Sequence, residues 1–182
     1  MSKVQETTRK PNYPVDLKYG KIGEKDFENH FEKCNKNGYS IFDVREFKEY
    51  QKIDIDYVID IKGEKQLPPV EDVLKEDRYI KIEVKLDSRA NDTGNIPYEM
   101  ISHSSSGWCV TTKSDYVYIV LVEKDGVNII KRGWINMKRW HEFCANRNCN
   151  KKISYIVSEN GIVDLLCKMS DLENNGVLKW IN

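Results

Sequence analysis

Two segments of the sequence alternate apolar and polar residues with a period of two, which predicts β-strands. These segments are residues 53–61 and Tyr79–Asp87. The polar face of the first strand carries the acidic residues Asp54, Asp56 and Asp60. The polar face of the second carries acids and lysines, namely Lys81, Glu83, Lys85 and Asp87. Because residues i and i+2 of a strand share a face, we expect Glu83 and Lys85 to project side by side.

This set of side chains suits the hydrolysis of a phosphodiester bond. Mg²⁺ and Mn²⁺ prefer hard oxygen ligands, usually one or two carboxylates together with water and phosphate oxygens. Asp56 and Glu83 supply two carboxylates if their strands pair, and the carbonyl of Val84 is a further ligand. Lys85 would orient or deprotonate the attacking water, or neutralise charge that develops on the phosphate. The sequence therefore predicts a site for Mg²⁺ (or Mn²⁺) beside a catalytic lysine.

The elements around these strands predict one α/β domain with a central mixed β-sheet flanked by helices. Residues 1–19 are polar, lack a period and are interpreted as a flexible N-terminal arm, which leaves 20–182 as the domain. The other elements are expected in chain order as a helix from Ile22 to Cys34, a strand at 39–44, an extended piece at 95–101, a hairpin over 116–135, a helix from Asn136 to Ala145, a strand at 154–157 and a helix at 162–169.

The string Ile82-Glu83-Val84-Lys85, placed after an Asp-bearing strand, resembles the motif of the PD-(D/E)XK nuclease superfamily. The order of elements is also similar: a helix with Gly-Glu near its start, a strand, the Asp strand and the E-x-K strand. No literal Pro-Asp precedes the strand, which is a departure from the pattern. The resemblance spans residues 20–123 and implies a restriction-endonuclease-like fold.

The resemblance also assigns roles to individual residues. Asp56 corresponds to the catalytic aspartate because an apolar strand follows it directly, although Asp54 and Asp60 share its face and stay open as alternatives. Glu24, in the pair Gly23-Glu24, corresponds to a helix glutamate that helps to hold the metals; an acid in a helical first turn is the competing interpretation. Glu99 would approach the site from the segment that follows the E-x-K strand.

Several basic residues are candidates for gripping a nucleic-acid backbone. They lie beyond the E-x-K strand and in the C-terminal half: Arg89, Lys113, Lys131, Arg132, Lys138 and Arg139. Solvated charge around core tryptophans is the alternative interpretation. Lys plus Arg and Asp plus Glu both number 29, so the net charge is zero, and a protein that coats nucleic acid by overall charge is excluded.

Composition and cysteine usage complete the expectations. The chain has 182 residues, 40% hydrophobic, with no apolar run of membrane-spanning length, so no membrane partner is expected. Five cysteines, an odd number, favour reduced thiols and a cytoplasmic location. We thus expect a metal-dependent DNA endonuclease; the alternative is a non-catalytic nucleic-acid-binding or regulatory domain on the same fold. The choice of DNA over RNA and a homodimeric state are left open.

Overall fold

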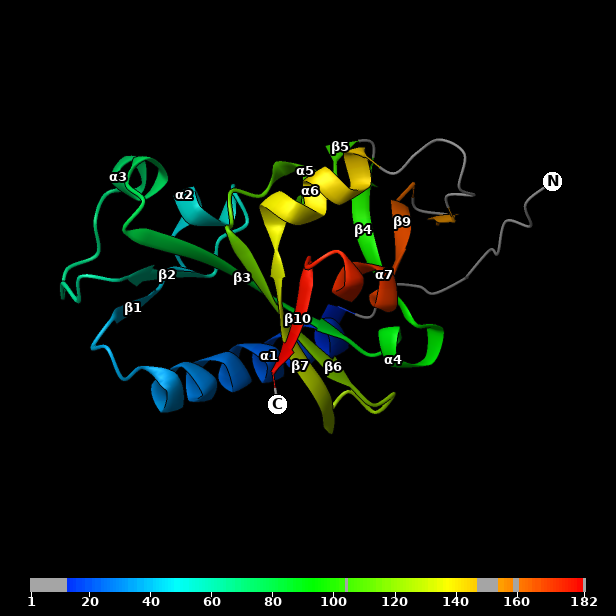
Figure 1. The fold of residues 1–182 in the computed structure, drawn as a ribbon, viewed down its shortest axis with the longest axis horizontal. Coiled ribbons are helices and arrows are strands. Elements are labelled where there is room, and N and C mark those ends of the chain that lie inside the picture. Colours follow the sequence, from blue (N-terminus) through cyan, green and yellow to red (C-terminus); the bar gives the residue numbers. More distant parts are fainter. Residues whose placement is uncertain (1–12, 104, 147–153, 159–160, 182) are drawn as a thin grey trace.

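A computed structural model describes residues 13–103, 105–146, 154–158 and 161–181 of the chain (Figure 1). The first twelve residues of the predicted N-terminal arm lie outside these ranges. Residues 13–19, which were also assigned to the arm, belong instead to helix α1 (Tyr13–Cys34). The prediction began this helix at Ile22, the first residue of its apolar stripe, whereas the helix already begins at Tyr13.

A mixed six-stranded sheet forms the centre of the fold, with the strand order β1-β2-β3-β6-β7-β10. Neighbouring strands are antiparallel except β3 and β6, which are parallel. The α/β class with a mixed sheet flanked by helices, predicted from the sequence, is confirmed. The strands are β1 (Ser40–Asp43), β2 (Tyr57–Asp60), β3 (Tyr79–Asp87), β6 (Tyr116–Val122), β7 (Ile129–Asn136) and β10 (Leu178–Ile181).

The parallel pairing of β3 with β6 requires a long crossover, because parallel neighbours cannot be joined by a tight hairpin. Residues 88–115 make this connection and contribute short elements of their own. They are α4 (Ala90–Thr93), β4 (Asn95–Ser102), β5 (Ser105–Ser106) and α5 (Trp108–Thr111). By contrast, β6 and β7 form the predicted hairpin, in which Gly126 supplies the positive φ of 72° that the turn needs.

A second, four-stranded sheet has the order β5-β4-β9-β8, with β8 at Tyr155–Val157 and β9 at Val163–Lys168. The prediction of a helix over residues 162–169 is therefore wrong. A short segment that is only mostly apolar does not distinguish strand from helix by its pattern, and here β9 pairs with β4 on one side and β8 on the other. This pairing sets Glu99 of β4 opposite Asp164 of β9.

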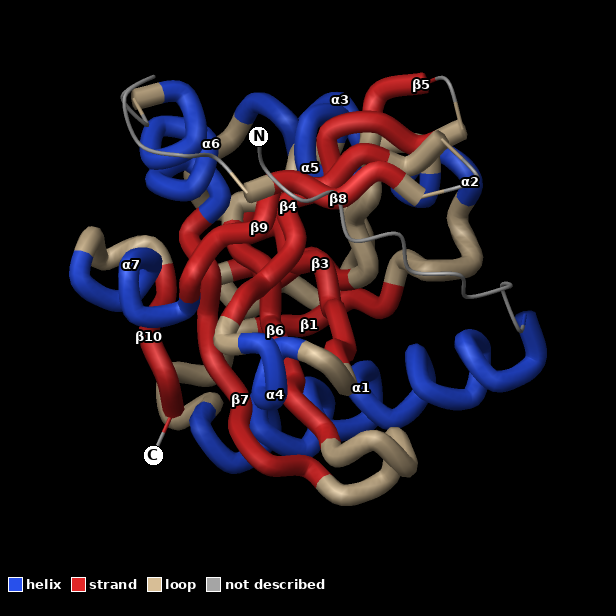
Figure 2. Tube along the Cα trace, turned by 90° about the vertical axis from the view of Figure 1, so that its right-hand side faces the viewer, coloured by secondary structure: helices blue, strands red, loops and turns tan. Residues whose placement is uncertain are grey.

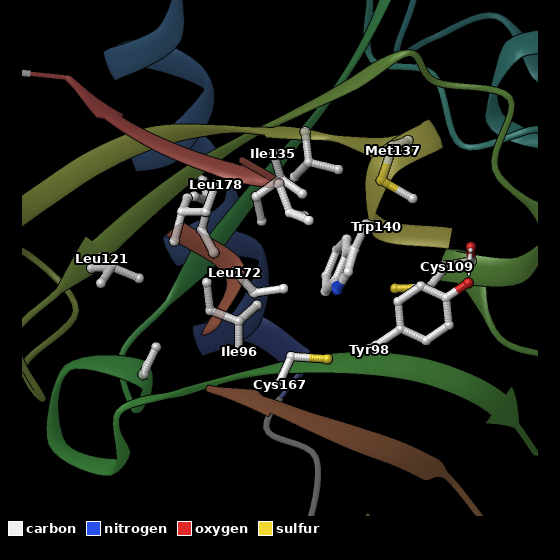
Figure 3. Close-up of a cluster of buried hydrophobic side chains, with 14 residues drawn as sticks. Ile96, Tyr98, Cys109, Leu121, Ile135, Met137, Trp140, Cys167, Leu172 and Leu178 are labelled. Atoms are coloured by element: carbon white, nitrogen blue, oxygen red, sulfur yellow. Dashed lines mark hydrogen bonds between the residues drawn. The ribbon is translucent and has the colours of Figure 1, made fainter. Parts of the chain in front are cut away.

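The two faces of the central sheet are covered differently. Helix α1 crosses one face, where Gly23 allows a close approach: a Cβ there would lie 3.3 Å from the Val84 side chain (Figure 1). The second sheet and α5, α6 and α7 cover the other face (Figure 2), enclosing a core that includes Tyr98 and Trp140 (Figure 3). The helices not yet given are α2 (Lys48–Gln51), α3 (Val70–Lys75), α6 (Met137–Ala145) and α7 (Met169–Asn174).

Strand β2 is shorter than the alternation of residues 53–61 predicts, because the chain turns before Tyr57. Asp54 has a φ of 52°, which is incompatible with an extended strand. Its carbonyl accepts hydrogen bonds from the hydroxyls of Thr112 at 3.0 Å and Ser114 at 2.7 Å. These bonds hold the backbone of Asp54 against the segment that leads into β6, so regular pairing of β2 begins only at Tyr57.

Candidate active site

The two candidate strands separate where β2 begins. Tyr57, the first residue of β2, pairs with Ile82, and Asp56 donates its backbone N–H to the carbonyl of Ile82 at 2.9 Å. Past this point β3 continues in pairing with β6 on its other side. On the β2 side of β3, the Asp56 carboxylate takes the place of a strand partner: its Oδ2 accepts a hydrogen bond from the N–H of Val84 at 2.8 Å. Asp56 is therefore fixed at a fork between β2 and β3.

Glu83 is buried next to Asp56, on the face of β3 opposite α1. It is only 4% exposed, and its Oε2 has no hydrogen-bond partner among the residues that the structure describes. Burial raises the pKa of Glu83; Lys85 opposes the rise, Asp56 adds to it, and the result is about 7. Burial also raises the pKa of Asp56, against the hydrogen bond from Val84 and the charge of Lys85. The two carboxylates are thus close together, and both pKa values stay raised although Lys85 opposes the rise.

Lys85 projects on the same side of β3 as Glu83, as the i, i+2 spacing predicts. Its Nζ lies 2.5 Å from Glu83 Oε1 and 4.6 Å from the centroid of the Trp108 ring. Burial would lower the pKa of Lys85, but the carboxylates of Glu83, Asp56 and Asp54 outweigh it and the pKa is raised. Lys85 is therefore a charged ammonium group, and its side chain keeps 37% of its surface exposed.

The two alternatives to Asp56 have different positions. Asp60 lies at the far end of β2, where its carboxylate accepts hydrogen bonds from the backbone of Lys62 at 2.9 Å and Glu64 at 3.3 Å. It stabilises a turn and takes no part in the fork. Asp54 is near the fork, since its charge acts on both Glu83 and Lys85, and its Oδ2 accepts a hydrogen bond from the Thr111 hydroxyl at 3.1 Å.

Glu24 approaches the fork from α1, near the middle of the helix rather than near its start. Burial raises its pKa, Arg45 opposes this, and the charge of Asp56 adds to the rise, so Glu24 and Asp56 are neighbours. Glu24 is ion-paired with Arg45, which also contacts Asp43 at 2.5 Å and Glu28 at 3.3 Å. Arg45 was not among the predicted residues, and no motif in the sequence marks it.

The donors at the fork fit a divalent cation of the magnesium type. Glu83 Oε2 is a buried oxygen without a partner among the described residues, and the neighbouring Asp56 supplies a second carboxylate. The N–H and C=O of a strand residue point to the same side, so the carbonyl of Val84 faces the Asp56 side as its N–H does. Hard oxygen donors of this kind are typical magnesium ligands. Within the described residues, no group of three or more His, Cys, Asp and Glu side chains is arranged to hold a metal ion.

The predicted backbone-gripping residues do not form one surface. Lys113 and Lys138 line an open groove of about 610 Å³, which also includes Lys81. The other four are spread over the fold. Arg132 is hydrogen-bonded to Asp26 of α1, and Lys131 lies over the ring of Trp180. Arg139 donates to the carbonyl of Gly176, and Arg89 is exposed just before α4. Lys113 and Lys138 are thus the members that share a concave surface.

Comparisons with known proteins leave the fold and this site as the basis for assigning a function. No protein-family model matches the chain, and neither the search of curated proteins nor that of solved structures found a match. No helix among the described residues has the length and apolar character needed to span a membrane. The class that the coordinates define is an α/β protein with a mixed central sheet and an acidic fork beside a lysine.

Proposed function

We propose that this protein is a metal-dependent nuclease that hydrolyses phosphodiester bonds of nucleic acid, as a DNA endonuclease. The observation that supports the proposal is the fork itself. Glu83 is buried beside the half-buried Asp56, Glu83 Oε2 has no partner among the described residues, and the Nζ of Lys85 lies 2.5 Å from the other oxygen of Glu83. Burying two acids together is costly unless a cation neutralises them.

Each side chain at the fork has a distinct task in this proposal. Asp56, Glu83 and the Val84 carbonyl would hold Mg²⁺ or Mn²⁺, with Glu24 as a further acid nearby. Such an ion withdraws charge from the phosphate and lowers the pKa of a bound water. Lys85 orients the attacking water or donates to a phosphate oxygen, and its raised pKa keeps it protonated for the second role. Water attacks the phosphorus in line with the oxygen that leaves.

The order of elements supports a restriction-endonuclease-like fold of the PD-(D/E)XK type. Helix α1 carries Gly23-Glu24, β1 follows, Asp56 directly precedes β2, and β3 carries the E-x-K triplet. Gly23 also has a packing role that fits this arrangement, because it brings α1 against β3 beside the site. Glu24 then lies where the charge of Asp56 raises its pKa.

The proposal includes DNA as the partner and the cytoplasm as the place of action. Lys113 and Lys138, which share the open groove with Lys81, are the residues best placed to contact a backbone. Arg89, which is exposed beyond the end of β3, is a further candidate for contact with the backbone. The cytoplasmic location rests on the odd number of cysteines.

The proposal is tested by incubating the full chain with single-stranded, duplex and branched DNA and with RNA. Each substrate is combined with Mg²⁺, Mn²⁺, Ca²⁺ or EDTA. We expect DNA to be cleaved with Mg²⁺ and Mn²⁺ and left intact with EDTA, while Ca²⁺ supports binding without efficient cleavage. Cleavage that persists after exhaustive chelation would contradict the metal site. Binding without cleavage of any substrate would identify a non-catalytic nucleic-acid-binding domain instead.

A further inference from the structure

A cavity of about 210 Å³ opens beside Lys85, on the face of the central sheet opposite α1. Its walls come from both sheets and from α5 and α6, and they are largely apolar. Trp108 and Trp140 contribute aromatic surface, and Glu99 and Asp164 contribute acidic groups. The cavity therefore adjoins the proposed catalytic lysine without sharing the fork carboxylates, and the proposed hydrolysis makes no use of it.

Trp140 lines this cavity, and its indole N–H is a buried hydrogen-bond donor without a partner among the described residues. The residue is 1% exposed, and its Nε1 has no hydrogen-bond partner within the part of the chain that the structure describes. Its ring packs edge-to-face against Tyr98, with the ring centroids 5.0 Å apart (Figure 3). The Trp108 ring is also edge-to-face, at a centroid distance of 6.3 Å. Buried tryptophan N–H groups usually have a partner, because an unpaired donor costs free energy. An acceptor on a ligand would remove that cost.

Glu99 and Asp164 supply acceptors in the same cavity. They face each other across the β4–β9 pair, an arrangement that like charges disfavour. Burial, and after it the charge of Glu99, raises the pKa of Asp164 to about 6. Glu99 Oε1 is held by the backbone N–H of Trp108 at 3.2 Å, which fixes one acid in place. A ligand that brings N–H donors would stabilise both carboxylates.

The size and chemistry of the cavity fit a flat heteroaromatic ring. A cavity of about 150 Å³ accepts benzene, so 210 Å³ is enough for a ring with polar substituents. Proteins that read unstacked bases hold them against aromatic side chains and bond their Watson–Crick edges. Guanine presents two adjacent donors, N1–H and the amino group, together with the acceptor O6. Two carboxylates and one indole N–H match that edge.

We propose that this cavity binds an unpaired guanine base of the strand whose phosphate lies at Lys85. The inference rests on the proposed function, since it takes the ligand to be part of a nucleic-acid substrate. Glu99 and Asp164 accept from the N1–H and amino groups, Trp140 Nε1 donates to O6, and Trp108 contributes apolar contact. The protein would then select the base next to the phosphate that it cleaves.

The test is a binding titration that needs no cleavage. Tryptophan fluorescence of the full chain is followed with GMP, AMP, CMP and UMP, and then with single-stranded oligonucleotides that contain one guanine or none, in EDTA. We expect GMP and the guanine-containing strand to bind at least about tenfold more tightly than the others. Trp140→Phe and Asp164→Asn should each weaken GMP binding by about tenfold, because each removes one hydrogen-bonding partner.

Trp134→Phe is the matched control, since Trp134 packs in the core on the α1 side of the sheet and should leave GMP binding unchanged. Equal binding of all four nucleotides, no binding of any, or a Trp140→Phe variant that binds like wild type would overturn the inference. GMP that binds while the strand does not would assign the cavity to a free nucleotide. GMP binding by a protein that cleaves no substrate would keep the cavity and reject the nuclease.

Discussion

Two carboxylate–cation pairs lie on opposite faces of the central sheet, and they differ in how completely they are satisfied. On the α1 side, Asp26 receives Arg132 Nε at 2.9 Å and Tyr118 Oη at 2.7 Å on one oxygen, and Arg132 NH2 at 2.8 Å on the other. On the opposite side, Glu83 receives Lys85 on one oxygen and no described residue on the other. Their side chains are 13% and 6% exposed, so burial alone does not distinguish them.

The difference separates a structural pair from a candidate functional one. A bidentate guanidinium and a phenol satisfy the Asp26 carboxylate, and that geometry favours a single arrangement. A lysine ammonium on one oxygen leaves Glu83 able to accept another cation. Three buried side-chain atoms of the described residues lack a hydrogen-bond partner, namely Glu83 Oε2, Trp140 Nε1 and Arg78 Nε. The last has an ion-pair partner in Glu76 at 3.1 Å, which leaves the Glu83–Trp140 face as the unsatisfied one.

The largest expected effect comes from removing the charge of Glu83. Glu83→Gln keeps the side-chain shape but loses a proposed metal ligand, so DNA cleavage with Mg²⁺ should fall by about 10²-fold or more. Lys85→Ala should reduce cleavage to a similar degree. Circular dichroism should show that Glu83→Gln stays folded, and metal-free DNA binding should match wild type. A Glu83→Gln variant that cleaves normally would remove Glu83 from the site.

The matched change on the other face should act on stability instead. Asp26→Asn removes the negative charge of the Asp26–Arg132 pair and places an amide N–H group next to the donors of Arg132 and Tyr118. We expect a loss of about 2 kcal/mol in the free energy of unfolding, discounted because the Arg132 side chain is 37% exposed. Urea denaturation measures this loss. Cleavage per folded molecule should stay within about twofold of wild type, and a large fall in cleavage would mean that the two faces are not functionally distinct.

The smallest expected effect is on the pH dependence of stability. The pKa of Glu83 is raised to about 7, so the folded state binds a proton more tightly than the unfolded chain does. Stability that Glu83 contributes in its protonated form is therefore lost as pH rises from the ordinary glutamate pKa toward 7. Urea midpoints of the metal-free protein should fall over that range, and Glu83→Gln should reduce the fall. A pH dependence that is identical in the variant would show that Glu83 does not titrate there.

The sequence predicted the E-x-K strand because both of its faces obey a local rule: Ile82 and Val84 pack under α1 while Glu83 and Lys85 face the other way. It also predicted that Asp56 lies near Glu83. The predicted geometry was partly wrong, since Asp56 precedes β2: its own N–H donates to the carbonyl of Ile82, and its carboxylate accepts from the N–H of Val84. Local patterns thus identified the residues of the fork but not the geometry that joins them.

Other features could not be predicted because they depend on contacts between distant segments. Arg45 lies near the fork through ion pairs with α1 and β1, which no spacing encodes. The burial of Glu83, which lies on the polar face of its strand, results from the second sheet and α5 covering that face. The cavity joins Lys85 to Asp164, whose strand β9 was predicted as a helix. Each of these requires the crossover and the C-terminal strands to be in place.

The crossover between β3 and β6 has a consequence for the order in which the protein assembles. Asp56 directly precedes β2, and Glu83 lies on β3, which is the next strand of the chain and the antiparallel partner of β2, so the two residues can meet once a local loop closes. The cavity needs residues 88–115 to loop out and β6 to align in parallel, and it then needs β9 to return from far along the chain. Closing longer loops costs more chain entropy and slows pairing. We therefore expect the acidic fork to form early in folding and the cavity beside it to be completed last.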